Sequence, residues 1–273
     1  MVNFPIAIQL YSVRDDMAKD FEGTLKKIKA MGYDGVEFAG TYGKSAAEIK
    51  KLCADIGLVP VSAHVPFAYM MQDPEATIAT YKEMGCEQVV IPYLMPEFRP
   101  GADRFGEVIE GAKVLGAACK KLGMMLAYHN HDFEFIKLDG EYALDILYRE
   151  VPADLLQTQL DTCWVNVGGE NPAEYIKKYS GRTPTVHLKD FVGSKGKNMY
   201  ALIGIDDGAQ KKADENEAFC LRPVGYGKQD FPAILKAAEE SGAKWVIVEQ
   251  DNPSMDKTPM ECAEMSINYL KSL

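Results

Sequence analysis

Residues 4–39 read FPIAIQLYSVRDDMAKDFEGTLKKIKAMGYDGVEFA, and the fold depends on the pattern in this stretch. An apolar run at 4–10 is followed at 20–32 by apolar residues spaced three and four apart, and then by a second apolar run at 34–39. Short apolar runs predict buried strands, while the spacing between them predicts an amphipathic helix that ends at Gly32. The stretch therefore predicts a strand, a helix and a second strand.

The same pattern repeats along the chain, and helical segments that close in glycine lie between most of the apolar runs. The eight predicted strands cover residues 4–10, 34–39, 58–65, 87–93, 124–129, 155–161, 183–190 and 243–251. Strands that alternate with helices are typical of parallel α/β folds, and eight such units in 273 residues match a (β/α)8 barrel. No G-x-G-x-x-G motif follows the first strand, so a dinucleotide-binding sheet lacks its usual mark. We predict a single TIM barrel domain over residues 1–273.

One segment does not fit the repeat. Residues 191–229 are rich in Gly, Lys, Asp and Asn and are too polar for a core element. We interpret them as an insertion after strand seven that serves as a lid or as an oligomer contact, so a homo-oligomer is one expectation.

Composition narrows the class of protein. The chain is 47% hydrophobic, enough for a large core, and its 40 acidic against 30 basic residues disfavour a nucleic-acid partner, which needs a basic face. The N-terminus lacks a basic region, and its apolar run is too short for a signal peptide or membrane span. The six cysteines are far apart without a C-x-x-C pair, which is typical of reduced thiols. We expect a cytoplasmic protein that binds neither nucleic acid nor membrane.

Polar side chains gather at the predicted strand ends, where barrel enzymes place their chemistry. They are Gln9, Arg14, Glu37, His64, His129, His131, Glu134, Asp161, His187, Lys189, Glu249 and Asp251. All four histidines of the chain lie at or just past strand ends. Scattered histidines rarely do this, and the convergence indicates a functional site.

Each of these residues also has a purely structural interpretation. Asp161 suits a helix cap, which is the commoner use of an aspartate after a strand. Lys189 and Asp251 suit an ion pair at the rim of the barrel. Glu249, however, follows the apolar run WVIV, and a buried carboxylate needs a cation or a proton. A divalent metal bound by Asp161, His187 and Glu249 meets these needs together.

Seven motifs, in order along the chain, resemble those of a known family. They are QLYSVRDD, SAHV, YHNHDFEF, QLDTCWVNVGG, HLKD, PVGYGKQDF and VIVEQD. Over essentially its whole length the chain resembles the xylose isomerase-like barrels of the sugar phosphate isomerase/epimerase superfamily. The resemblance implies one divalent ion (Mn, Mg, Co or Zn), held by Glu, Asp, His and Glu from strands five to eight. Three of these ligands correspond to Asp161, His187 and Glu249.

The first ligand departs from the family pattern. Where many relatives carry a glutamate, this chain has the triplet His129-Asn130-His131. Either His129 takes the metal position, or Glu134 reaches back from the turn, and we favour Glu134 because a third carboxylate suits Mn or Mg. The change leaves His131 or His129 as the base that removes a proton, together with Glu249.

The resemblance implies a metal-dependent isomerase or epimerase that acts on a keto sugar or related polyol through an enediolate. The alternative is a lyase or dehydratase of a keto sugar, a keto-glycoside or an inosose on the same site. Lys189 is a candidate for catalysis and for substrate binding, and His64, Gln9 and Arg14 are further candidates for binding the sugar. Metal-dependent endonucleases of the superfamily resemble this chain less, since their zinc cluster needs about five histidines.

Overall fold

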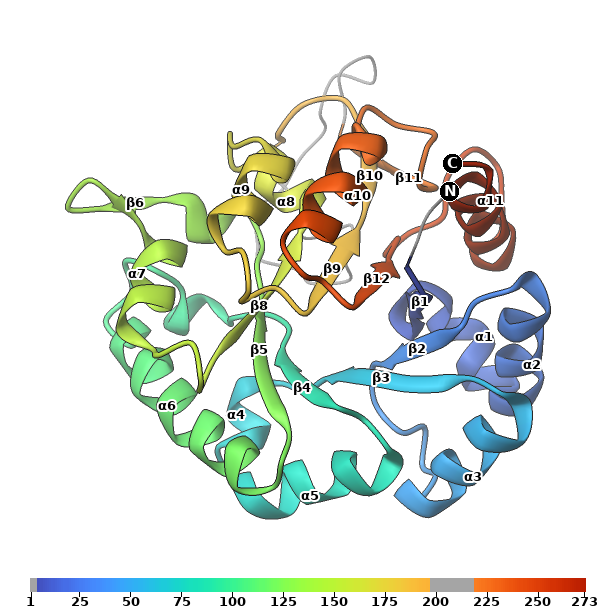
Figure 1. Ribbon diagram of the computed structural model, residues 1–273, viewed down its shortest axis with the longest axis horizontal. Coiled ribbons are helices and arrows are strands. Elements are labelled where there is room, and N and C mark those ends of the chain that lie inside the picture. Colours follow the sequence, from blue (N-terminus) through green and yellow to red (C-terminus); the bar gives the residue numbers. More distant parts are fainter. Residues whose placement is uncertain (1–3, 197–218) are drawn as a thin grey trace.

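The computed structural model describes residues 4–196 and 219–273, and its centre is a closed barrel of eight parallel strands (Figure 1). Around the barrel the strands follow the order β1-β12-β9-β8-β5-β4-β3-β2. Their bounds are β1 Ile6–Gln9, β2 Gly35–Phe38, β3 Val59–His64, β4 Gln88–Ile91, β5 Met125–His129, β8 Gln157–Asp161, β9 Thr185–Leu188 and β12 Trp245–Val248. Each corresponds to one of the eight strands predicted from the sequence, so the predicted fold class is confirmed.

Helices surround this barrel (Figure 1). The longer ones are α2 Phe21–Met31, α3 Ala46–Ile56, α5 Pro74–Met84, α6 Phe105–Lys121, α7 Ala143–Glu150, α9 Pro172–Lys178, α10 Phe231–Glu240 and α11 Pro259–Ser272. Short helical segments follow several strands: η1 Leu10–Val13, α1 Arg14–Lys19, α4 Phe67–Met70, η2 Pro96–Phe98, η3 Phe133–Phe135 and α8 Thr162–Val167. The segments that follow the strands position the site, because they begin where the polar side chains gather.

Local capping signals fix the helix ends. Ser45 and Glu48 form a capping box at the start of α3, as their spacing predicts. Gly32 ends α2 with a φ of 100°, a left-handed conformation that glycine adopts without steric cost. These signals are local in sequence, which explains why they were predictable.

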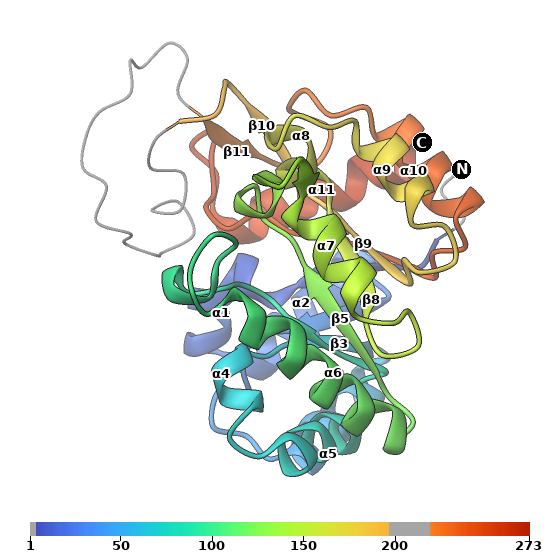
Figure 2. The same ribbon diagram turned by 90° about the vertical axis from the view of Figure 1, so that its left-hand side faces the viewer.

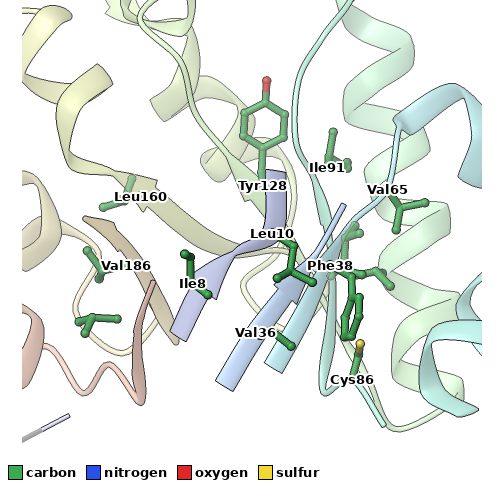
Figure 3. Close-up of a cluster of buried hydrophobic side chains, with 14 of the residues drawn as sticks. Ile8, Leu10, Val36, Phe38, Val65, Cys86, Ile91, Tyr128, Leu160 and Val186 are labelled. Carbon is green, nitrogen blue, oxygen red and sulfur yellow. The ribbon is translucent and has the colours of Figure 1, made fainter. Parts of the chain in front are cut away.

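The apolar core lies between the strands and the helices (Figure 3). Alternation along each strand directs every second side chain into this layer. On β9, Val186 and Leu188 are buried in the apolar core, whereas the hydroxyl of Thr185 lies within the barrel, 2.9 Å from Nε2 of Gln88. His187 shares the inner face with Thr185, and this alternation presents it to the site.

Three features were not predicted from the sequence. Helix α7 begins after Tyr142 without a side-chain cap, and it is preceded by a hairpin of β6 (Lys137–Leu138) and β7 (Glu141–Tyr142). A second pair, β10 (Asp190–Val192) and β11 (Cys220–Arg222), lies at the same end of the molecule as α8 (Figure 2). The predicted insertion 191–229 begins in β10 and includes β11, and its residues 197–218 lie outside the described residues.

In the part of the chain that the structure describes, no helix combines the length and apolarity needed to cross a membrane.

Candidate active site

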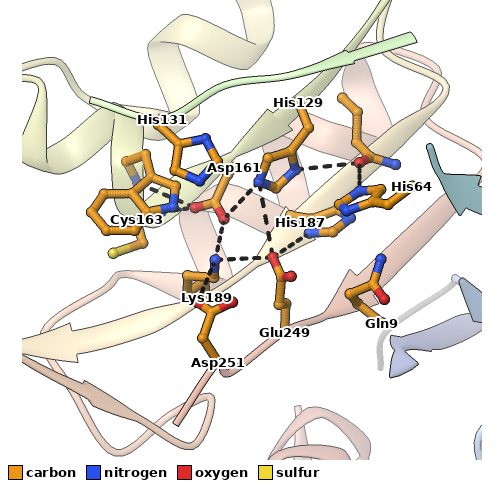
Figure 4. A network of polar contacts seen from close by, with 12 residues as sticks. Gln9, His64, His129, His131, Asp161, Cys163, His187, Lys189, Glu249 and Asp251 are labelled. Atoms are coloured by element: carbon orange, nitrogen blue, oxygen red, sulfur yellow. Dashed lines mark hydrogen bonds and ion pairs between the residues drawn. The ribbon is translucent and has the colours of Figure 1, made fainter. Parts of the chain in front are cut away.

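Four buried side chains meet at the carboxyl ends of adjacent strands (Figure 4). His129 ends β5, Asp161 ends β8, His187 lies in β9, and Glu249 directly follows β12. One ligand-capable atom from each lies within 4.8 Å of those of the other three. The strand order places β5, β8, β9 and β12 side by side, so residues far apart in sequence form one cluster.

The two carboxylate oxygens of Asp161 have different contacts: one caps a helix and the other faces the cluster. Oδ1 accepts the backbone N–H groups of Cys163 and Trp164 at 2.8 and 3.1 Å, so the predicted cap of the following helix is present. Oδ2 lies 3.6 Å from Nε2 of His129 and 3.1 Å from Nζ of Lys189, and it accepts no hydrogen bond from any described residue. The capping and site interpretations of this residue are therefore compatible.

Lys189 is buried among three carboxylates. Its Nζ lies 2.9 Å from Oε2 of Glu249, 3.1 Å from Oδ2 of Asp161 and 3.0 Å from Oδ2 of Asp251. Burial alone would lower the pKa of Lys189, but the three carboxylates outweigh it and hold the pKa well above its ordinary value. The ion pair with Asp251 that the sequence suggested is present, but both partners are buried.

Glu37 on β2 joins the cluster from the opposite side of the barrel. Its Oε1 accepts from Nε2 of Gln9 at 2.7 Å and lies 2.9 and 2.8 Å from Nε2 of His64 and His187. Its Oε2 accepts from Ser62 at 2.5 Å and from Gln159 at 2.7 Å.

The ring of His187 is held between two carboxylates, with Nε2 against Glu37 and Nδ1 3.0 Å from Oε2 of Glu249. Burial would lower the pKa of His187, but Glu37 and Glu249 raise it to about 10. Sequence analysis placed Glu37 at a strand end without a role. A charged residue inside the apolar run DGVEFA was the available signal.

His131 lies in an aromatic environment. Its ring is parallel to Phe133 at 5.5 Å between centroids, and the rings of Tyr93 and Trp164 lie at 5.0 and 5.4 Å. Burial holds the pKa of both His131 and its neighbour His129 well below the ordinary imidazole value. His131 therefore presents a neutral ring.

Glu134 is committed to the turn after β5. Its carboxylate accepts from the hydroxyl of Tyr128 at 2.6 Å and from the backbone N–H of His131 at 2.8 Å. Burial raises the pKa of Glu134 to about 8. Within the described residues the four-membered cluster contains His129 and not Glu134, so this geometry favours His129 as the fourth ligand. Asn130 points away and accepts the backbone N–H of Asp161 at 3.0 Å, which ties β5 to β8.

A cavity of about 460 Å³ lies above the cluster. Its walls are formed by Tyr11, Ala39, Gly40, His64, Pro66, Pro92, Tyr93, His129, His131, Lys189, Glu249 and Asp251. His64 and Lys189, two of the predicted substrate-binding residues, belong to this wall.

Gln9 and Arg14, also predicted to bind substrate, are not among these wall residues. Gln9 bonds Glu37 and the backbone N–H of Tyr11, and Arg14 donates to the carbonyl oxygens of Tyr11 and Asp251 at 3.0 and 2.6 Å. Both side chains hold neighbouring parts of the site in place.

The cluster fits a divalent cation. Two imidazoles and two carboxylates are common ligands of Mn, Co and Zn. Burial raises the pKa of Asp161, since its charged form lacks water. Its Oδ2 accepts no hydrogen bond from the described residues, so this oxygen is available to contact a cation. The metal would be held by His129, Asp161, His187 and Glu249.

A closed parallel barrel with imidazoles and carboxylates at its strand ends, below a cavity, defines a (β/α)8 barrel with a candidate metal site. The chain belongs to the xylose isomerase-like TIM barrel family, whose model matches residues 25–273.

Several known proteins are similar to this chain in sequence or in structure. An inosose dehydratase of Clostridium botulinum (strain Alaska E43 / Type E3) is 25% identical, over 94% of this chain and 91% of its own length. A sugar phosphate isomerase/epimerase from Parabacteroides distasonis ATCC 8503 superposes with a TM-score of 0.76 at 22% identity, covering 98% of this chain and 93% of that one. The IOLI protein with a binding zinc atom has a TM-score of 0.71 at 16% identity, covering 98% and 97%. Isomerases, epimerases and dehydratases thus share this architecture.

Proposed function

We propose that the protein is a divalent-metal-dependent lyase or dehydratase that acts on a keto sugar, a keto-glycoside or a cyclic keto-polyol. One observation carries this proposal: two imidazoles and two carboxylates converge within 4.8 Å at the base of a cavity whose wall also holds His131 and Lys189. A metal bound there acts as a Lewis acid toward the carbonyl oxygen of the sugar. The zinc found in the similar IOLI protein supports the proposal that this protein also binds a divalent metal.

The chain's own residues carry the proton. The neutral ring of His131 accepts the proton from the carbon next to the carbonyl, and the electron pair of the broken C–H bond forms an enediolate. The carbonyl then re-forms, and a C=C bond forms between the carbon that lost its proton (the α-carbon) and the β-carbon beyond it. The C–O bond at the β-carbon breaks. The leaving oxygen takes the proton back from His131, so that water or an alcohol departs. Lys189 would contribute by neutralising the carboxylates of Asp161, Glu249 and Asp251 beside the substrate, because its ammonium contacts all three.

The composition of strand five favours elimination over epimerisation. Epimerisation needs a proton-transfer group on each face of the substrate carbon, and the resembling epimerases use two metal-bound glutamates for this. In this chain the position opposite Glu249 in the cluster is occupied by His129, an imidazole, and not by a second glutamate. Elimination needs only one such group, and the curated relatives that match almost the whole chain include inosose dehydratases.

Isomerisation or epimerisation of a keto sugar is the second candidate. The superposition on a sugar phosphate isomerase/epimerase with a TM-score of 0.76 supports it. Both candidates begin with the same enediolate and differ in what happens to the carbon beside it.

One experiment separates the two candidates. The Mn²⁺-loaded protein is incubated in deuterated water with inosose and with keto-hexosides, and the products are followed by NMR. Elimination predicts an unsaturated product with release of water or alcohol, whereas epimerisation predicts deuterium at the carbon with all oxygens retained. Neither deuterium uptake nor product from any of these compounds would reject both.

A variant tests the base. His131→Asn should keep the fold and the metal content while lowering proton removal by about 100-fold or more, which is the usual loss for a general base. His64→Asn, at another histidine of the cavity wall, is the comparison, and a smaller loss is expected there. An unchanged rate in His131→Asn would assign this histidine to the scaffold.

A further inference from the structure

The cavity wall is divided between two halves of the barrel. The loops after β1 to β4 contribute Tyr11, Ala39, Gly40, Pro66, Pro92 and Tyr93. The ends of β5, β9 and β12 contribute His129, His131, Lys189, Glu249 and Asp251. His64, at the end of β3, is the exception in the first half. Because the strand order keeps β1 to β4 contiguous, the cavity has one apolar side and one charged side.

In the proposed reaction the charged side holds the sugar, and its described wall residues carry no excess of positive charge. Lys189 is the cation of this side among the wall residues, and three carboxylates contact it at 2.9 to 3.1 Å. Arg14 donates to backbone carbonyls, and Arg99 donates to the carbonyl of Leu94 and to the hydroxyl of Tyr93. A phosphate group, which needs uncompensated cationic donors, is poorly matched to this arrangement.

The apolar side of the cavity is lined by aromatic and proline rings. Tyr11 and Tyr93 line this side with rings that also contact the guanidinium groups of Arg14 and Arg99, at 4.3 and 5.1 Å from the ring centroids. Pro66 and Pro92 line it with apolar rings. The whole cavity has a volume of about 460 Å³, which lies in the range of pockets for drug-sized ligands. Aromatic and proline surfaces bind an aromatic ring through apolar burial and stacking.

We propose that the substrate is a keto-glycoside without a phosphate, whose aromatic aglycone occupies the apolar side formed by the loops after β1 to β4. This assignment rests on the proposed function and specifies its substrate class. In the elimination described above, the aglycone then departs as the alcohol.

Binding of unreactive analogues tests the assignment separately from catalysis. Phenyl and methyl glucoside have no ring carbonyl and therefore no acidic C–H bond, so calorimetry with the protein in Mn²⁺ measures affinity alone. Phenyl glucoside should bind at least about tenfold more tightly than methyl glucoside. Glucose 1-phosphate should bind no more tightly than methyl glucoside. Equal affinities, tighter binding of the phosphate, or no binding of phenyl glucoside would overturn the assignment.

A matched pair of variants locates the aglycone. Ala39→Asp places a carboxylate in the apolar side and should remove the preference for phenyl over methyl, whereas Ala39→Ser should retain most of it. A preference that persists in Ala39→Asp would place the ring elsewhere. The deuterium experiment decides the function independently: a phenyl preference without proton exchange supports the assignment and contradicts the proposed chemistry, and exchange without preference does the reverse.

Discussion

Single side chains set the chemistry of this site. Glu37 contacts more of the surrounding side chains than the sequence suggested. Five donor groups contact its two oxygens, and one of them is Nε2 of His187, whose Nδ1 faces Glu249. A carboxylate on the far nitrogen of a ligating histidine fixes the tautomer and the orientation of the ring. We therefore propose that Glu37 is a positioning residue for the candidate metal site.

Glu37→Gln should weaken metal binding by about 10- to 100-fold, because the carboxylate that orients His187 is replaced by a neutral amide. Calorimetric titration of the metal-free protein with Mn²⁺ measures the change. Ser62→Ala removes a donor to the other oxygen of Glu37 and leaves the contact with His187 in place, so its affinity should change much less. Equal effects of the two substitutions would mean that Glu37 acts only through folding.

Sequence analysis identified part of this site for a physical reason. Asp161, His187 and Glu249 come from successive barrel strands, and parallel strands bring their carboxyl ends together, so the convergence was predictable. The choice between His129 and Glu134 depends on the path of the turn after β5, which periodicity does not encode. The burial of Lys189 among three carboxylates depends on contacts between β8, β9 and the segment after β12, and it was equally hidden.

Among the secondary-structure elements, α7 shows what the sequence pattern did not reveal. It has eight residues and no side-chain cap, so neither its length nor its ends give a strong local signal. It is held instead by a long-range contact: Asp145 accepts from the hydroxyls of Tyr175 and Tyr179 and pairs with Lys178 on or next to α9. Tertiary contact, and not local propensity, stabilises this helix.

The contacts of Asp145 predict how the stability of the fold depends on pH. Burial alone would raise the pKa of Asp145, but hydrogen bonds from Lys178, Tyr175 and Tyr179 hold it below its ordinary value. A lowered pKa in the folded state stabilises the protein above the unfolded pKa of about 3.9, and this stabilisation is lost as the pH falls through the folded value.

Asp145→Ala should therefore lower the free energy of unfolding by about 1–3 kcal/mol at neutral pH, with a difference that shrinks below about pH 4. Urea denaturation across this pH range measures it. Lys178→Ala, which removes the half-exposed partner only, should cost under about 1 kcal/mol. A difference between Asp145→Ala and the parent that is constant with pH would contradict the role of the charge.

For the whole molecule, closure of the barrel is what creates the site. The cluster joins residues separated by more than a hundred positions, and buried carboxylates face each other across it. A ligand that binds only the folded state stabilises it by mass action. The divalent ion should therefore act as a structural as well as a chemical component.

Adding Mn²⁺ to the metal-free protein at about 100 times its Kd should stabilise the fold by about 2.7 kcal/mol. For a domain of this size that corresponds to a rise in Tm of roughly 5–10 °C, and differential scanning calorimetry measures it. The rise should be absent in His187→Ala, which removes one ligand. An equal rise in this variant would indicate that the ion binds elsewhere.

The central claim is the position and ligand set of the metal, and a crystal grown with Mn²⁺ tests it most directly. An anomalous difference map should show one strong peak at the ends of β5, β8, β9 and β12, roughly 2.0–2.3 Å from ligand atoms of His129, Asp161, His187 and Glu249. The side chain of Glu134 should remain bonded to Tyr128 and to the backbone of His131. A peak bound by Glu134 in place of His129 would contradict the ligand set, and the absence of any peak in the cluster would contradict the account of the site.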